Sequence, residues 1–293
     1  MKSFADYHPL VLFVYYLAVV SLTVFLLHPA IIIFSLLGAV VFFAFLVPVR
    51  PFSRDIVFYF FVFLLVAITN PIFVHKGETI LFFLNDNPVT FEAIVYGIVV
   101  AAMLVAVIFW SKAYSILMTS DKFMYLFGKA IPKLSLVMSM ALRFIPEFKA
   151  QIKKVNRAQK SIGLYTSDSI TDRMLSSLRT FNSVLAWSFE HAIHQADAMK
   201  ARGYGLKGRT NFFLFRWKRR DVTMFISISL LIVAIFWLIH RGVFAYNYYP
   251  ALTAVEWSLE QLPQFAIVFL FMILPALIEL KENLLWIYLK STI

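Results

Sequence analysis

Residues 10–47 read LVLFVYYLAVVSLTVFLLHPAIIIFSLLGAVVFFAFLV and contain no Asp, Glu, Lys or Arg. A helix needs about 20 apolar residues to cross the hydrocarbon core of a bilayer, so this stretch is long enough for two transmembrane helices. Proline is accepted in the first turn of a helix but not in its interior, and Pro29 therefore marks the turn between them. Because the stretch has only one clear break, a re-entrant segment is the alternative, which would change the number of spans by one.

Similar apolar runs recur along the chain, and we expect an all-α integral membrane protein with about six transmembrane helices. The composition, 61% hydrophobic and 15% charged, lies outside the range of soluble domains. The first run leads directly into a second, which favours a span over a cleaved signal. Pro48 and Pro51 separate the second span from the third. The predicted spans are residues 10–27, 30–47, 56–74, 91–110, 222–240 and 265–285.

Positive charge is concentrated in residues 111–220, which hold 20 of the 27 Lys and Arg residues but only 6 of the 16 Asp and Glu residues. Positively charged loops stay on the cytoplasmic side of a membrane, so we expect this segment and both termini to be cytoplasmic. The predicted organisation is transmembrane helices 1–4 in residues 1–110, a cytoplasmic region in 111–220, and transmembrane helices 5–6 in 221–293. The sequence RWKRR at 216–220 lies beside a span, which favours contact with anionic lipid over nucleic acid.

Within the basic segment, apolar residues recur every three or four positions, which predicts two long amphipathic helices. The turn between them covers residues 165–169, and Asp168, Ser169 and Thr171 are each competent to cap the second helix. The simplest interpretation of the two apolar stripes is a core, formed against each other or against the membrane surface. The stripes consist of Ala141, Ile145, Phe148, Ile152 and Val155, and of Met174, Leu178, Phe181, Leu185, Phe189, Ala192, Ala196 and Met199.

The two amphipathic helices end in matching hexads, AQKSIG at 158–163 and AMKARG at 198–203. A glycine just past the last turn is typical of a left-handed C-cap, and a cation such as Arg202 in the last turn interacts favourably with the helix dipole. These preferences explain each end separately. They do not explain why the two hexads match at a spacing of 40 residues. A duplicated pair of helix ends indicates docking on a duplicated partner.

Evidence for catalysis or for a bound cofactor is weak. The chain has no cysteine. His191 and His194 lie near Glu190 and Asp197 with a spacing that could hold a metal, but a solvated helix face explains them equally well. Residues 203–210 have the spacing of a phosphate-binding loop but follow a basic helix, whereas such a loop follows a buried strand. We expect no catalytic residue, no metal and no nucleotide bound by this chain.

Residues 201–203, ARG, together with residues 141–146, ALRFIP, resemble the transmembrane T component of energy-coupling factor (ECF) transporters, which import vitamins and transition-metal ions. The resemblance implies two cytoplasmic coupling helices, each docking by its end on one of two ABC-type ATPases. It also implies that ATP and Mg are bound by those ATPases. A small membrane subunit would bind the substrate.

By this resemblance, the stripes hold the substrate-binding subunit and the helix ends hold the ATPases. The implied substrate-subunit contacts are Ala141, Ile145, Phe148, Leu178, Phe181 and Leu185. The implied docking residues are Ala201, Arg202 and Gly203 with Lys200, and Ser161, Ile162 and Gly163 with Lys160.

The first hexad departs from the family pattern, because Ile162 stands where the family has arginine. An aliphatic side chain lacks the planar donor group that pairs with carboxylates and carbonyls. Three explanations remain open. Lys160 or Arg157 supplies the charge, or Ile162 enters an apolar groove on a divergent ATPase so that the two ATPases are not identical, or the first contact is weak.

The expected function is that of a membrane scaffold in a prokaryotic cell membrane, coupling ATPase motion to a substrate-binding subunit. A self-contained permease is one alternative, although its spans would need buried charges, and the predicted spans contain almost none away from their ends. A lipid-modifying membrane enzyme is the other, with Glu190, His191, His194 and Asp197 as its only candidate groups. The sequence does not indicate the transported substrate.

Overall fold

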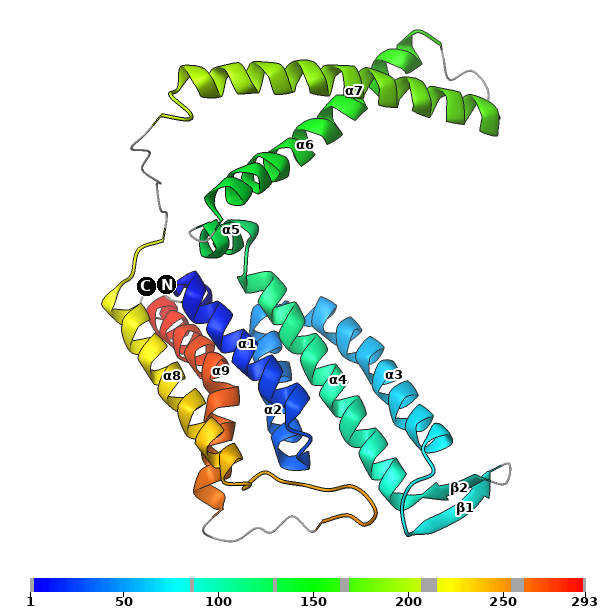
Figure 1. Cartoon of the computed structure of the whole chain (residues 1–293), viewed down its shortest axis with the longest axis vertical. Coiled ribbons are helices and arrows are strands. Elements are labelled where there is room, and N and C mark those ends of the chain that lie inside the picture. Colours follow the sequence, from blue (N-terminus) through cyan, green and yellow to red (C-terminus); the bar gives the residue numbers. More distant parts are fainter. Residues whose placement is uncertain are drawn as a thin grey trace. The chain divides into compact units, whose positions relative to one another are not determined.

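The computed structural model describes residues 3–84, 87–128, 131–163, 169–206, 215–253 and 261–291. These residues are mainly helical, with one short β-hairpin, which confirms the predicted all-α membrane fold (Figure 1). The elements are η1 (Phe4–Asp6), α1 (Pro9–Phe25), α2 (Pro29–Leu46), α3 (Val49–Phe73), β1 (Ile80–Leu84), β2 (Asn87–Thr90), α4 (Phe91–Leu117), α5 (Ser120–Gly128), α6 (Pro132–Ser161), α7 (Ile170–Ala201), α8 (Arg219–His240) and α9 (Leu262–Ser291).

The chain forms two compact units. The membrane unit comprises Met1–Lys122 and Phe215–Ile293, and the α6–α7 unit comprises Phe123–Leu214. The first boundary lies beyond residue 110 because α4 continues without a break to Leu117. The second lies before residue 220 because Phe215 already belongs to the membrane unit. The α6–α7 unit is therefore one insertion between α4 and α8.

The apolar helices of the membrane unit run alternately in opposite directions (Figure 1). Five described helices, α2, α3, α4, α8 and α9, are long and apolar enough to cross a membrane, and α1 is a shorter apolar helix of 17 residues. At 1.5 Å per residue α1 is about 26 Å long. Residues 10–47 thus form two antiparallel helices, and Pro29 opens the second as predicted.

The start of α3 differs from the predicted span. The helix begins at Val49, seven residues before residue 56, with Pro48 as its N-cap residue. Pro51 lies in the first turn, where the backbone N–H would have no acceptor within the helix, so its missing donor costs nothing there. Only Val47 and Pro48 separate α2 from α3, and Arg50 and Arg54 lie on the first turns of α3.

The core of the membrane unit is aromatic. Trp110 is fully buried, and its indole N–H donates to the Ser35 hydroxyl at 3.1 Å. The Thr23 and Ser35 hydroxyl oxygens are 2.6 Å apart, so α1, α2 and α4 share one satisfied polar cluster. At Gly38, an added Cβ would lie 2.7 Å from the Met272 carbonyl oxygen. Glycine therefore allows the close approach of α2 and α9.

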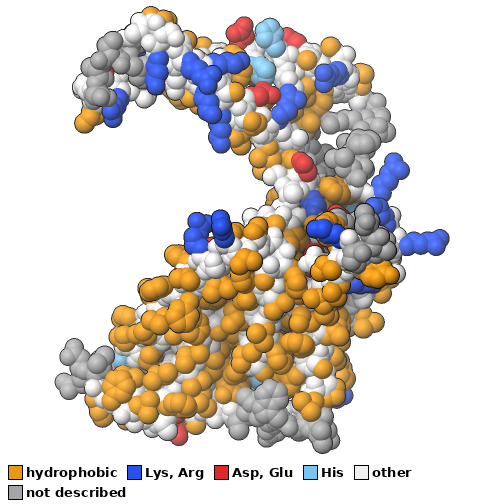
Figure 2. All heavy atoms as spheres, turned by 180° about the vertical axis from the view of Figure 1, so that it is seen from behind, with side chains coloured by type: hydrophobic (Ala, Val, Ile, Leu, Met, Phe, Trp, Pro, Cys, Tyr) orange, Lys and Arg blue, Asp and Glu red, His pale blue; other side chains and the backbone are white. Residues whose placement is uncertain are grey.

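Hydrophobic side chains cover the face of the membrane unit that Figure 2 shows. On α3 the only buried residues are Tyr59 and Pro71, while Phe58, Phe61 and Leu65 are exposed. Exposed apolar surface on this scale is expected where lipid is the solvent. Both chain ends lie at the same end of the membrane unit as the start of α8, and the β-hairpin lies at the opposite end (Figure 1).

Candidate functional site: two matched helix ends

The ends of α6 and α7 have the same backbone geometry. Ile162 and Arg202 are the C-cap residues, with φ/ψ of −86°/1° and −81°/7°. The glycines that follow, Gly163 and Gly203, have φ of 77° and 79°. Left-handed φ values strain residues that carry a Cβ. The left-handed glycine C-cap predicted for both hexads is confirmed.

Hydrogen bonds repeat between the two ends. In each, the cap N–H donates to the carbonyl of the hexad's first alanine at 3.2 Å. The glycine N–H donates to the hexad lysine's carbonyl, at 3.1 Å in the first end and 2.9 Å in the second. In the second end, the Tyr204 N–H also donates to the Met199 carbonyl at 3.0 Å, which completes a Schellman motif. The corresponding residue of the first end lies outside the described ranges.

The side chains presented by the two ends differ in chemistry. Ile162 is 75% exposed. Arg202 is also exposed, and its side chain forms no ion pair within the part of the chain that the structure describes. The Ser161 hydroxyl donates to the carbonyl of Arg157 at 3.0 Å and so belongs to its own helix. One end therefore offers an apolar branched side chain, and the other offers a cationic donor group.

The apolar stripes remain largely on the surface of the α6–α7 unit. Ala141 and Ile145 on α6 are exposed, and Phe148 is half-buried. On α7, the stripe residues from Met174 to Phe189 are all exposed; they are Met174, Leu178, Phe181, Leu185 and Phe189. The two stripes therefore do not form a core against each other, and most of this apolar surface is available to a partner or to lipid.

Polar side chains hold the two helices together instead. Gln159 of α6 and Ser176 and Thr180 of α7 are buried. The Ser176 and Thr180 hydroxyls lie 3.2 Å and 3.3 Å from the Gln159 amide oxygen, and the Thr180 hydroxyl also lies 2.8 Å from the Asn156 amide oxygen. The three-to-four periodicity of apolar residues does not reveal this cluster, because all its members are polar.

A second contact lies nearer the start of α6. Phe148 packs edge-on against Trp187, with ring centroids 5.7 Å apart, and Trp187 stacks on His191 at 5.0 Å. The His191 Nε2 atom lies 3.3 Å from the Glu147 carboxylate. Residues further along α6 contact residues further back on α7, so the helices are antiparallel.

The histidines of α7 have different surroundings. His191 faces α6, whereas His194 is exposed and lies 3.9 Å from Glu190 on its own helix. Among the described residues, no three His, Asp or Glu side chains are placed to hold a metal ion. Of the segment with phosphate-loop spacing, residues 207–210 lie outside the described ranges.

Comparison with known proteins gives a consistent result. Residues 5–212 match the model of the CbiQ family, described as cobalt transport protein. The chain is 30% identical over 187 residues to the energy-coupling factor transporter transmembrane protein EcfT of Listeria innocua, covering 60% of this chain and 71% of that protein. It is 27% identical over 195 residues to EcfT of Staphylococcus aureus, covering 62% and 73%. The family match includes both helix ends.

Proposed function

Because this chain belongs to the CbiQ family and is the transmembrane T component of an ECF transporter, we propose that it couples two ABC-type ATPases to a small substrate-binding membrane subunit. One observation carries the proposal. The backbone geometry of the α6 end is repeated 40 residues later at the α7 end, as two equivalent partner sites require. A self-contained permease or a lipid-modifying enzyme has no comparable support.

Each helix end docks on one ATPase. At the second end, Arg202 is the principal contact, because its planar guanidinium pairs with carboxylates or carbonyls, and Ala201 and Gly203 are small enough to allow close approach. Lys200 adds positive charge. At the first end, Ile162 takes the place of arginine, beside Ser161, Gly163 and Lys160. The two ATPases supply the ATP and Mg sites and are non-identical where they meet these different ends.

The exposed stripes hold the substrate-binding subunit. Their apolar side chains on α6 and α7 form a surface that water would solvate poorly, and a membrane protein partner would cover it. ATP-driven closure of the ATPases then moves the two helix ends, and the helices carry that motion to the substrate-binding subunit. The proposed contacts are Ala141, Ile145, Phe148, Leu178, Phe181 and Leu185.

We place the end of the membrane unit that carries both termini in the cytoplasm of a prokaryotic cell. Arg50 and Arg54 at the start of α3 and Arg219 at the start of α8 supply the positive charge expected on that side. The basic stretch at 216–220 also contacts anionic lipid headgroups.

The test is Arg202→Glu in the purified complex. We expect loss of one ATPase from the complex and loss of uptake when a panel of labelled vitamins and Co²⁺ is offered to proteoliposomes. Arg179→Glu is the matched control, because it makes the same charge change at an exposed position of the same helix. If Arg202→Glu retains both ATPases and normal uptake, the docking assignment is wrong.

A further inference from the structure

Residues 3–8, here the N-terminal segment, are packed into the end of the membrane unit. Phe4 is fully buried, with its ring centroid 5.6 Å from that of Tyr15 and 5.9 Å from that of Phe42. His8 is also buried. Three further sets of contacts tie this segment to other parts of the membrane unit.

The first tie is to α9. Glu279 is only 8% exposed. Its carboxylate accepts a hydrogen bond from the Ser3 hydroxyl and another from the Phe4 N–H at 2.9 Å. A buried carboxylate is stabilised when donors satisfy its oxygens. Glu279 thus ties Ser3 and Phe4 to α9.

The second tie joins the N-terminal segment to the residues that follow α4, where the chain continues from the membrane unit into the α6–α7 unit. The Lys122 ammonium donates to the Ala5 carbonyl at 2.7 Å and to the Leu117 carbonyl, at the end of α4, at 2.9 Å. Lys122 is the last residue of the membrane unit before the insertion. Burial lowers the pKa of its ammonium, while the charge of Asp6 opposes that shift.

The third tie joins the N-terminal segment to the residues before and at the start of α8, where the chain re-enters the membrane unit. The Arg220 guanidinium donates to the Asp6 carbonyl at 2.9 Å and lies 4.5 Å from the centre of the Tyr7 ring. His8 stacks on Trp217 with centroids 4.1 Å apart. These contacts join the N-terminal segment to the first residues of the returning chain.

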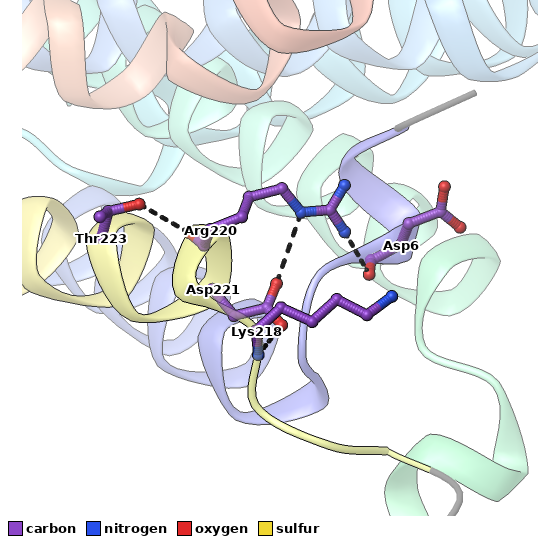
Figure 3. A network of polar contacts seen from close by, with 5 residues as sticks. All are labelled: Asp6, Lys218, Arg220, Asp221 and Thr223. Atoms are coloured by element: carbon purple, nitrogen blue, oxygen red, sulfur yellow. Dashed lines mark hydrogen bonds and ion pairs between the residues drawn. The ribbon is translucent and has the colours of Figure 1, made fainter.

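Arg220 is itself oriented by a buried acid. Asp221 is 2% exposed, and its carboxylate lies 3.6 Å from the Arg220 Nε atom. The same carboxylate accepts a hydrogen bond from the Lys218 backbone N–H at 3.1 Å (Figure 3). The acid therefore both caps the first turn of α8 and directs the guanidinium toward Asp6.

From these three ties we infer that the N-terminal segment is a clasp that holds both roots of the α6–α7 insertion, residues 118–122 and 215–220, to α9. Lys122 and Arg220 are then positioning residues for coupling. The inference rests on the proposed function, in which force applied to the helix ends must reach the membrane unit. If the two roots could move independently, motion of the helix ends would displace the roots without moving the helices of the membrane unit. One six-residue peptide tied to both roots and to α9 makes them move together.

Arg220→Gln tests the clasp in the complete transporter. Arg219→Gln is the matched control, because it removes the same charge from the same helical turn at an exposed residue. Among the described residues, the Arg219 side chain forms no hydrogen bond, ion pair or cation–π contact with the N-terminal segment. The readout is uptake per ATP hydrolysed in proteoliposomes, using whichever labelled vitamin or Co²⁺ the wild-type complex accumulates. We expect a several-fold lower ratio for Arg220→Gln alone, with ATPase association unchanged. Equal ratios for the two variants would overturn the inference.

A second measurement needs no partner subunit. Hydrogen–deuterium exchange of the purified chain in lipid nanodiscs compares wild type with Glu279→Gln, which weakens acceptance from Ser3 and Phe4. We expect faster exchange at residues 3–8 and also at both roots. Faster exchange confined to residues 3–8 would mean ordinary terminal packing and would overturn the clasp. If the wild-type chain binds no ATPase, the proposed function fails, while this exchange experiment still decides the clasp.

Discussion

Gly163 and Gly203 adopt the same left-handed conformation at the ends of α6 and α7, with φ of 77° and 79°. The residues before them, Ile162 and Arg202, share one backbone conformation but carry unrelated side chains. The difference between the two candidate docking sites is therefore chemical rather than conformational. A partner that accepts Arg202 must offer acceptor groups, whereas one that accepts Ile162 must offer apolar surface.

Ile162→Ala should weaken association with one ATPase by roughly tenfold. Burial of an isoleucine side chain contributes about 1.5–3 kcal/mol, and truncation to alanine loses most of that contribution. Co-purification and binding titrations of the two ATPases provide the measurement. Lys160→Ala is the comparison, since it removes the charge that could replace the missing arginine. A large effect of Lys160→Ala with none from Ile162→Ala would instead assign the first site to electrostatic docking.

Gly203→Ala should loosen the end of α7. The left-handed conformation costs a residue with a Cβ about 1–2 kcal/mol, and the added Cβ would lie 3.1 Å from the Leu206 Cδ1 atom. We expect faster hydrogen exchange at the amides of Gly203 and Tyr204, which close the Schellman motif. Gly203→Asn should be milder, because asparagine tolerates this conformation. Identical exchange in Gly203→Ala and wild type would contradict the prediction.

Local signals explain what the sequence predicted correctly. Apolar runs identified the membrane helices, the three-to-four periodicity identified α6 and α7, and glycine identified their caps, because each feature depends on neighbouring residues only. The start of α3 was misplaced because proline breaks a helix interior but is neutral in a first turn. Whether Pro51 falls in a helix interior or in a first turn depends on where α2 ends. Because α2 has already ended before Pro48, α3 begins at Val49 and Pro51 lies in its first turn.

Contacts between distant residues were not predictable in this way. Glu279 and Phe4 are 275 residues apart, and no spacing rule connects them. The Gln159–Thr180 contact lies between two helices whose relative register the periodicity does not determine. Its residues are polar and so lie outside the apolar periodicity. For the candidate site, the sequence predicted the C-cap geometry of the two helix ends. It did not predict whether each apolar stripe is buried or exposed.

Thr180→Val should loosen the antiparallel pairing of α6 and α7. The substitution removes the hydroxyl beside the Asn156 and Gln159 oxygens, and the loss of one hydrogen bond costs about 0.5–1.5 kcal/mol. The absence of cysteine allows spin labels at Lys153→Cys and Ala186→Cys without background labelling. We expect a broader distance distribution between the labels in Thr180→Val.

Ser183→Val is the matched control for that experiment, because the Ser183 hydroxyl is exposed and donates only within α7, to the Arg179 carbonyl at 2.9 Å. Its distance distribution should match that of the parent. Equal broadening in both variants would show that loss of a hydroxyl from α7, rather than loss of the buried cluster, changes the pairing.

Gly38→Ala should destabilise the membrane unit, although it adds only one methyl group. The new Cβ would lie 2.7 Å from the Met272 carbonyl oxygen and 3.1 Å from its carbon, so the backbone of α9 must move. That backbone is also fixed by the Tyr15 hydroxyl, which donates to the neighbouring Phe271 carbonyl at 3.1 Å. Overpacking of this kind costs about 1–3 kcal/mol. We expect a lower thermal unfolding midpoint in detergent for Gly38→Ala, but not for Ala44→Val, which adds more volume at an exposed position of the same helix. Equal midpoints for the two variants would mean that α2 and α9 have room to separate.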